Sequence, residues 1–273
     1  MKKKFIFYIY CLILFASLAC QSNSNQEKAR QSNGFDAEKS DPKAIEVVDA
    51  MQKVLGMPDH WRQARYFSYH WIVSKDGQTL VDHRHDWDRF TNRYRLEGTN
   101  RRGQHFVALF NTETKAGEVY LDGKKVTVDS TKQKIIENSY GSFINDSYWL
   151  IMPYKLKESG VVLKYDGPKD LDGKLFDVVK VTFESVGLTP QDTYWAYIDP
   201  EDHFMKKWDF FLQGWPAEHG RSSANWEDWQ DFNGIKLALN KPFGDKPVRI
   251  YFKDVKVSAQ PDEDMLTSSA KTF

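Results

Sequence analysis

The sequence predicts a mainly β (α+β) protein: a single large curved antiparallel sheet that forms an open half-barrel. An N-terminal helix and a mid-chain helical insertion are expected to cover its concave face. Three observations indicate this fold class. From residue 66 onward, apolar and polar residues alternate with a period of two in one run after another. Short turn motifs of Gly, Asp, Asn and Pro separate these runs. One long apolar stretch, residues 143–154, interrupts the alternation near the middle of the chain.

The first 19 residues have the pattern of a signal peptide. Three lysines at positions 2–4 precede the apolar run 5–19, whose 15 residues are fewer than the about 20 that span a bilayer. The run ends in Ser-Leu-Ala-Cys at Cys20, which resembles a bacterial lipobox, although an aliphatic residue is usual in place of Ser17. We expect Cys20 to be acylated, with palmitate, and to anchor the chain in a membrane. The alternative is an ordinary signal peptide followed by a cysteine.

Residues 20–40 are rich in Ser, Asn, Gln, Lys and Glu, which predicts a disordered tether. The folded domain is then expected to span residues 41–273. The only other cysteine, Cys11, lies in the segment to be removed, so no disulfide is expected. Gln21 rather than aspartate follows Cys20, which by the enterobacterial sorting rule indicates the outer membrane.

The charge balance argues against a nucleic-acid partner. Basic and acidic residues both number 38, and removal of the three lysines near the start leaves 35 basic against 38 acidic residues, a net charge of −3. A nucleic-acid-binding domain would carry a basic field.

The domain is predicted to begin with a helix. Asp41 suits the N-cap and Pro42 the first position, and apolar residues recur at helical spacing up to Leu55. From residue 66 the period changes to two, and Asp76-Gly77 predicts a two-residue hairpin turn. The predicted strands and hairpins cover residues 66–73, 78–87, 90–97, 104–111, 118–128, 161–165, 175–183, 193–199, 204–212, 225–232, 235–239 and 247–257.

Residues 130–154 break the strand pattern and are predicted to be helical. Within them, Asn145 and Asp146 can cap a helix start, and Pro153 stops a helix from continuing far. About two turns between these points are apolar nearly all round, which predicts a plug buried on most sides.

Three passages resemble the group of the periplasmic lipoprotein carrier LolA, its receptor LolB and the sensor-binding protein RseB. They are Asp-Phe-Asn-Gly-Ile-Lys-Leu at 231–237, Arg-Ile-Tyr-Phe-Lys-Asp-Val-Lys-Val at 249–257 and Trp-Ala-Tyr-Ile-Asp-Pro at 195–200. The resemblance covers most of residues 43–265. It implies an open, half-rolled barrel whose helices cover an apolar cavity. The sequence of residues 143–154 is most similar to that of a group of bacterial outer-membrane lipoproteins without an assigned activity.

Aromatic and aliphatic residues at alternate strand positions, together with the central helix, are expected to line such a cavity and to bind a lipid or acyl chain. The alternative is an ordinary packed core. The predicted lining residues are Phe67, Tyr69, Trp71, Tyr148, Trp149, Met152, Val181, Phe183, Trp208 and Phe210.

Three histidines form an alternative candidate site. With a two-residue turn at Asp76-Gly77, residue 70 faces residue 83 and residue 68 faces residue 85, so His70, His83 and His85 share one face of the hairpin. Such a set can bind zinc or copper. The alternative is an exposed polar face, and a turn longer by one residue would break the alignment.

Catalysis has little support in the sequence. There is no Gly-x-Ser-x-Gly motif, and no cysteine remains for a thiol mechanism. We therefore expect a non-catalytic lipoprotein without a cofactor, which binds an apolar ligand. One alternative is a module of the same fold that binds or senses an envelope protein, and a second is a metal-dependent enzyme at the histidines.

Overall fold

The computed structural model describes residues 34–184 and 188–273. The predicted signal peptide, Cys20 and most of the predicted tether lie outside the described residues. Within them, the protein is mainly β, as predicted, and its large antiparallel sheet is not closed into a barrel. No helix among the described residues is long and apolar enough to cross a membrane.

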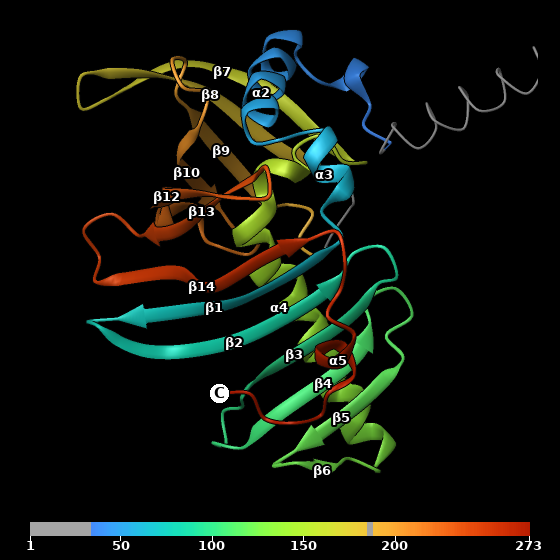
Figure 1. The fold of residues 1–273 in the computed structure, drawn as a ribbon. Coiled ribbons are helices and arrows are strands. Elements are labelled where there is room, and N and C mark those ends of the chain that lie inside the picture. The colour runs from blue at the N-terminus through green and yellow to red at the C-terminus, as the bar shows by residue number, and fades with distance from the viewer. Residues whose placement is uncertain (1–33, 185–187) are drawn as a thin grey trace, which may run out of the picture.

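The larger sheet has nine strands in the order β12-β13-β14-β1-β2-β3-β4-β5-β6 (Figure 1). Neighbouring strands are antiparallel, and most predicted strands match within a few residues. Its strands in chain order are β1 (Tyr66–Lys75), β2 (Gln78–Asp88), β3 (Arg93–Thr99), β4 (His105–Asn111), β5 (Gly117–Leu121), β6 (Lys124–Lys125), β12 (Glu227–Phe232), β13 (Ile235–Pro242) and β14 (Val248–Ser258).

Five more strands form a second, smaller sheet, in the order β11-β10-β9-β8-β7, whereas the sequence predicted one continuous sheet. The chain passes from the smaller to the larger sheet at Trp226, which is buried. This residue interrupts the predicted strand 225–232. The Trp226 N–H bonds to the carbonyl of Lys206 (2.7 Å) on the smaller sheet, so the strand bends there. These strands are β7 (Val161–Leu171), β8 (Lys174–Phe183), β9 (Thr193–Ile198), β10 (Met205–Phe211) and β11 (Ser222–Asn225).

The N-terminal helix starts at Pro42, as predicted, and packs against β7 and β8. The Asp41 carboxylate accepts from the N–H of Tyr165 (3.0 Å) on β7 instead of capping its own helix. Ser40 Oγ accepts from the N–H of Leu163 (2.9 Å), so the end of the predicted tether lies against the same strand. The helical segments are η1 (Ala37–Lys39), α2 (Pro42–Val54), α3 (Asp59–Gln63), α4 (Asp129–Lys155), η2 (Ala217–His219) and α5 (Glu263–Thr267).

The central helix α4 matches the predicted helical range 130–154 within one residue at each end, but it continues unbroken through the helix start predicted at Asn145 and Asp146. It runs for 27 residues, so Asn145 and Asp146 lie in its interior, and Pro153 is accommodated in its last turn. The prediction that this pair caps a helix was wrong. Tertiary packing stabilises the helix through these two residues, although their local sequence favours a helix start. Figure 1 shows α4 behind the nine-stranded sheet, reaching from β5 up towards the smaller sheet.

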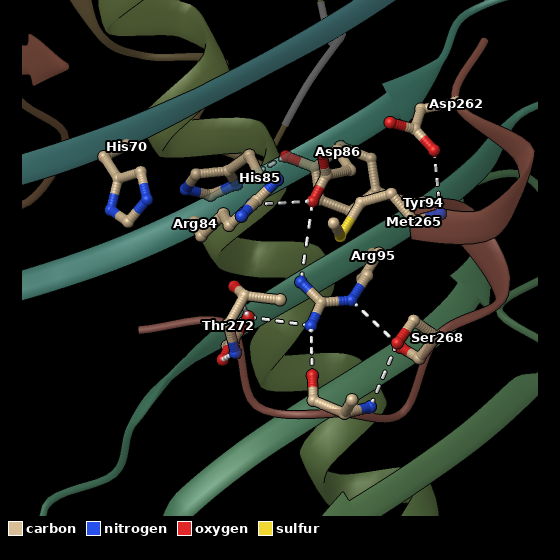
Figure 2. Close-up of polar contacts among 12 residues, drawn as sticks. His70, Arg84, His85, Asp86, Tyr94, Arg95, Asp262, Met265, Ser268 and Thr272 are labelled. Atoms are coloured by element: carbon tan, nitrogen blue, oxygen red, sulfur yellow. Dashed lines mark hydrogen bonds and ion pairs between the residues drawn. The ribbon is translucent and has the colours of Figure 1, made fainter. Parts of the chain in front are cut away.

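The opposite face of the nine-stranded sheet carries a buried ionic network. Arg95, Asp86 and Glu97 are all fully buried, and Arg95 Nη2 donates to Glu97 Oε2 (2.7 Å). The C-terminal segment crosses this network (Figure 2). Arg95 donates to the carbonyls of Ser268 (3.0 Å) and Ala270 (2.8 Å), so backbone acceptors of the C-terminal segment satisfy part of the guanidinium that strand alternation placed on this face.

Candidate functional site

A cavity of about 470 Å³ lies between α4 and the five-stranded sheet, within the range of small-molecule sites. One wall consists of α4 residues from Gly141 to Lys155, and the other of side chains on β7 to β10 and the loops that join them. Its apolar lining consists largely of Ile144, Tyr148, Trp149, Val161, Phe183, Leu188, Tyr194, Trp208, Phe210 and Leu212.

Aromatic rings form the floor of the cavity. Trp208 on β10 stacks on Tyr194 of β9, with ring centroids 4.6 Å apart. From α4, Tyr148 and Trp149 approach Trp208 to 5.8 and 5.2 Å. Register explains the arrangement, because Trp208 lies opposite the small Ala196, and Phe210, two residues on, points to the same face. These rings offer apolar surface already in place for a ligand.

Polar groups lie at the border of the cavity. Lys155 Nζ and Glu158 Oε2 form an ion pair (2.7 Å), and both side chains are partly exposed. Deeper, Asp192 is buried and accepts hydrogen bonds from Tyr194 Oη (2.8 Å) and Thr189 Oγ1 (2.6 Å). The deep carboxylate is thus satisfied internally, whereas the charged pair at the border is accessible. This distribution suits an amphiphile with an apolar chain and a polar end.

The structure brings together half of the predicted lining residues: Tyr148, Trp149, Phe183, Trp208 and Phe210. The other five do not line the cavity. Phe67, Tyr69, Trp71, Met152 and Val181 are buried in the main hydrophobic core instead.

Several lining residues were missed by the sequence reasoning. Tyr194 lies two residues before Ala196 on a strand that was predicted, so both side chains point to the same face. The alternation could therefore have indicated that Tyr194 faces the cavity. No sequence pattern indicated Gly141 as a lining residue. It lines the cavity because α4 continues through residue 141.

The histidines do not share one face, contrary to the prediction. The register of β1 and β2 shifts between Val73 and Ser74, where the exposed Leu80 is the extra residue. His70 therefore lies opposite Arg84, and its Nδ1 contacts Asp82 Oδ1 (2.7 Å) on the other face of the hairpin. The one-residue slip separates His70 from His83 and His85 because side chains alternate with a period of two.

His83 and His85 instead meet Asp146 of α4, a residue that the sequence reasoning placed at a cap. Asp146 Oδ2 lies 2.9 Å from His83 Nδ1 and 3.2 Å from His85 Nε2. His85 and Asp146 are buried, and the His83 side chain is 15% exposed. An acid within an apolar stretch was the sequence signal for this contact.

The surroundings set the charge of this cluster. Burial lowers the pKa of His85, although the neighbouring Asp146 opposes this effect. Burial raises the pKa of the Asp146 carboxyl, but the hydrogen-bonded His83 imidazole and the adjacent His85 imidazole together outweigh it, so the net pKa is lowered. At neutral pH the cluster therefore presents a carboxylate beside a neutral His85 imidazole.

A large antiparallel sheet that stays open, a long helix against it and an aromatic cavity between that helix and the five-stranded sheet define the class: half-barrel proteins with a helix-covered apolar pocket. The chain belongs to DUF6503, a family of unknown function whose model matches residues 2–235. A comparison with curated proteins finds no match.

Among solved structures, the chain is similar to a DUF1329 family protein from Desulfovibrio piger, with 9% identity, coverage of 84% of this chain and 99% of the other, and a TM-score of 0.46. A LolA superfamily protein from Nitrosomonas europaea matches with 10% identity, 81% and 96% coverage and a TM-score of 0.43. The lipoprotein LppX from Mycobacterium tuberculosis matches with 11% identity, 78% and 96% coverage and a TM-score of 0.29. The fold resemblance to the LolA group expected from the sequence is thus found again among solved structures, at identities of 9–11% and TM-scores of 0.29–0.46.

Proposed function

We propose that this protein is a non-catalytic, membrane-anchored lipoprotein that binds a lipid or acyl chain in the cavity between α4 and the five-stranded sheet. The observation that carries the proposal is the aromatic cavity of about 470 Å³, with an accessible ion pair at its border. Each methylene of a ligand that leaves water there contributes about 0.8 kcal/mol. The anchor belongs to the same proposal, with Cys20 as the acylated residue and the outer membrane as the location.

A variant at Gly141 tests ligand binding. Gly141 lines the cavity, and a Cβ added there meets nothing within 4 Å. Gly141→Leu should extend from this open position and fill part of the cavity, whereas Gly141→Ala should leave binding unchanged. Displacement of two methylenes corresponds to about a tenfold loss of ligand occupancy.

The measurement is native mass spectrometry of the full chain released from detergent. We expect a lipid or fatty acid retained by the wild type and by Gly141→Ala, and about tenfold less in Gly141→Leu. A denaturing spectrum separates this ligand from acyl groups attached to Cys20, because only the latter survive unfolding. A ligand-free wild type, or equal occupancy in all three proteins, would contradict the proposal. Capture of one protein partner by a ligand-free chain would favour the envelope interaction module instead.

A further inference from the structure

We propose that His83, His85 and Asp146 form a binding site for one divalent transition-metal ion, with zinc as the best fit. The site differs from the one predicted from the sequence, since His70 lies on the other face and a carboxylate of α4 takes its place. It is also separate from the proposed lipid cavity, because these three residues do not line it.

The distances fit a metal ion between the three side chains. One donor atom from each residue lies within 4.8 Å of the other two. In a tetrahedral zinc site with bonds of about 2.0–2.1 Å, neighbouring ligand atoms are roughly 3.3 Å apart. Asp146 Oδ2 lies 2.9 and 3.2 Å from the two imidazole nitrogens, close to this spacing, and the two nitrogens lie within 4.8 Å of each other, so their approach is the main adjustment that the ion would require.

A buried nitrogen without a partner points to the ion. Among the described residues, His85 Nε2 is buried and makes no hydrogen bond, although Asp146 Oδ2 is only 3.2 Å away. The other ring nitrogen, Nδ1, contacts Tyr94 Oη (2.6 Å), which leaves Nε2 as the ligand atom. A metal-bound histidine characteristically uses its second nitrogen in such an outer contact. An ion between Nε2 and Oδ2 would satisfy both atoms.

The surrounding residues hold the ligands in position. Asn145 Nδ2 donates to Asp146 Oδ1 (2.8 Å), leaving Oδ2 directed at the histidines. Tyr69 stacks on the His85 ring, with centroids 4.7 Å apart. Gly98 on β3 lies opposite His83, and a Cβ there would come within 2.8 Å of His83 Cδ2. The absence of a side chain at residue 98 therefore makes room for the His83 ring.

Two imidazoles and a carboxylate favour zinc over the hard ions calcium and magnesium, which take oxygen ligands. Three protein ligands also leave a fourth position for water or another donor. His83 is the ligand that reaches solvent, so the ion would enter from its side.

The test is metal binding by the full chain without an affinity tag, stripped with EDTA in detergent. Titration with zinc alone should give one equivalent by calorimetry, and cobalt(II) alone should give tetrahedral visible absorption. His83→Gln and Asp146→Asn should each lower the zinc affinity by more than about 100-fold. Loss of a residue that only hydrogen-bonds to a metal ligand usually has a smaller effect. Gly98→Ala, which keeps all three ligands, should also weaken binding by displacing the His83 ring.

His70→Gln is the matched control. His70 also contacts a carboxylate, that of Asp82, but no second histidine takes part in this contact. This variant should leave stoichiometry and affinity unchanged. Thermal unfolding with and without zinc checks that each variant folds, and the metal should raise the Tm of the wild type and the control. The proposal is overturned if the folded wild type binds no equivalent of either metal, or if His83→Gln and Asp146→Asn bind as the wild type does.

Discussion

Single residues on the outer face of the nine-stranded sheet show how a buried charge is stabilised. Burial disfavours the charged form of Glu97. The side chain and backbone N–H of Thr272 and the guanidinium of Arg95 outweigh this effect and lower the pKa of Glu97 to about 2 from an ordinary value of 4.5. Such a difference corresponds to roughly 3 kcal/mol of folding free energy at pH 7. Because the folded pKa is depressed, this stability is present above about pH 4.5 and is lost as the pH falls towards 2.

Thr272→Val should therefore make the protein more sensitive to acid. The substitution removes the hydroxyl that donates to Glu97 but keeps the N–H. The free energy of unfolding at pH 7 should fall by about 1–2 kcal/mol, and the difference from the wild type should narrow between pH 4.5 and 2. Urea unfolding across this range measures both effects. Thr267→Val is the control, since its hydroxyl contacts only backbone carbonyls of α5. A deficit independent of pH would mean that Glu97 is not the group involved.

At the scale of elements, α4 serves three environments along one helix. Its first half packs on a separate hydrophobic cluster of β3–β5 through Ile136 and Phe143. Asp146 then faces the histidines of β2, and Trp149 faces the five-stranded sheet. Asn145 lines the cavity and also donates to Asp146, so it connects the two candidate sites.

Trp149→Ala should loosen this helix and enlarge the cavity. Trp149 contacts Trp208, Phe210 and Phe243, with ring centroids 5.2–5.9 Å apart. Truncation of a large aromatic side chain costs about 3–5 kcal/mol, and partial exposure places Trp149 near the lower end. Urea unfolding and native mass spectrometry should show lower stability and altered ligand occupancy. Trp149→Phe, which keeps a ring against Trp208, should lie between Ala and the wild type. If Trp149→Ala changes neither quantity, α4 does not close the cavity.

At the scale of the whole molecule, one main hydrophobic core joins the two sheets. It includes residues from α2, β1, α4, β8 to β10, β13 and β14. The C-terminal segment meanwhile lies across the outer face of β2 to β4 (Figure 1). In the proposed function, an acylated Cys20 would hold this folded body at a membrane.

Replacement of Cys20 tests that anchor. In a bacterial host fed with labelled palmitate, Cys20→Ala should lose the label and leave the membrane fraction or remain as an unprocessed precursor. Cys11→Ala is the matched control, because residue 11 lies in the predicted signal peptide and its replacement should not affect labelling. Labelled Cys20→Ala, or an unlabelled wild type, would disprove acylation at this residue.

How much could be predicted from the sequence differs between elements and contacts. Strand alternation, turn motifs such as Asp76-Gly77 and the proline at the first position of α2 were local signals, so the strands and α2 could be predicted. Trp208 and Phe210 of β10 share one face for the same reason. The strand break at Trp226 could not be predicted, because it depends on a hydrogen bond to Lys206 in another part of the chain.

The sequence by itself determined the mainly β class, the antiparallel pairing of consecutive strands and the helix start at Pro42, since these depend on periodicity, on turn chemistry and on a proline at the first helical position. Only the tertiary structure decided which apolar residues line a cavity and which fill the core. It also decided the histidine partners: one extra residue at Leu80 turned His70 away, and the long helix brought Asp146 to His83 and His85. The physical reason is that register and long-range packing depend on the whole chain, and a slip of one residue reverses a face.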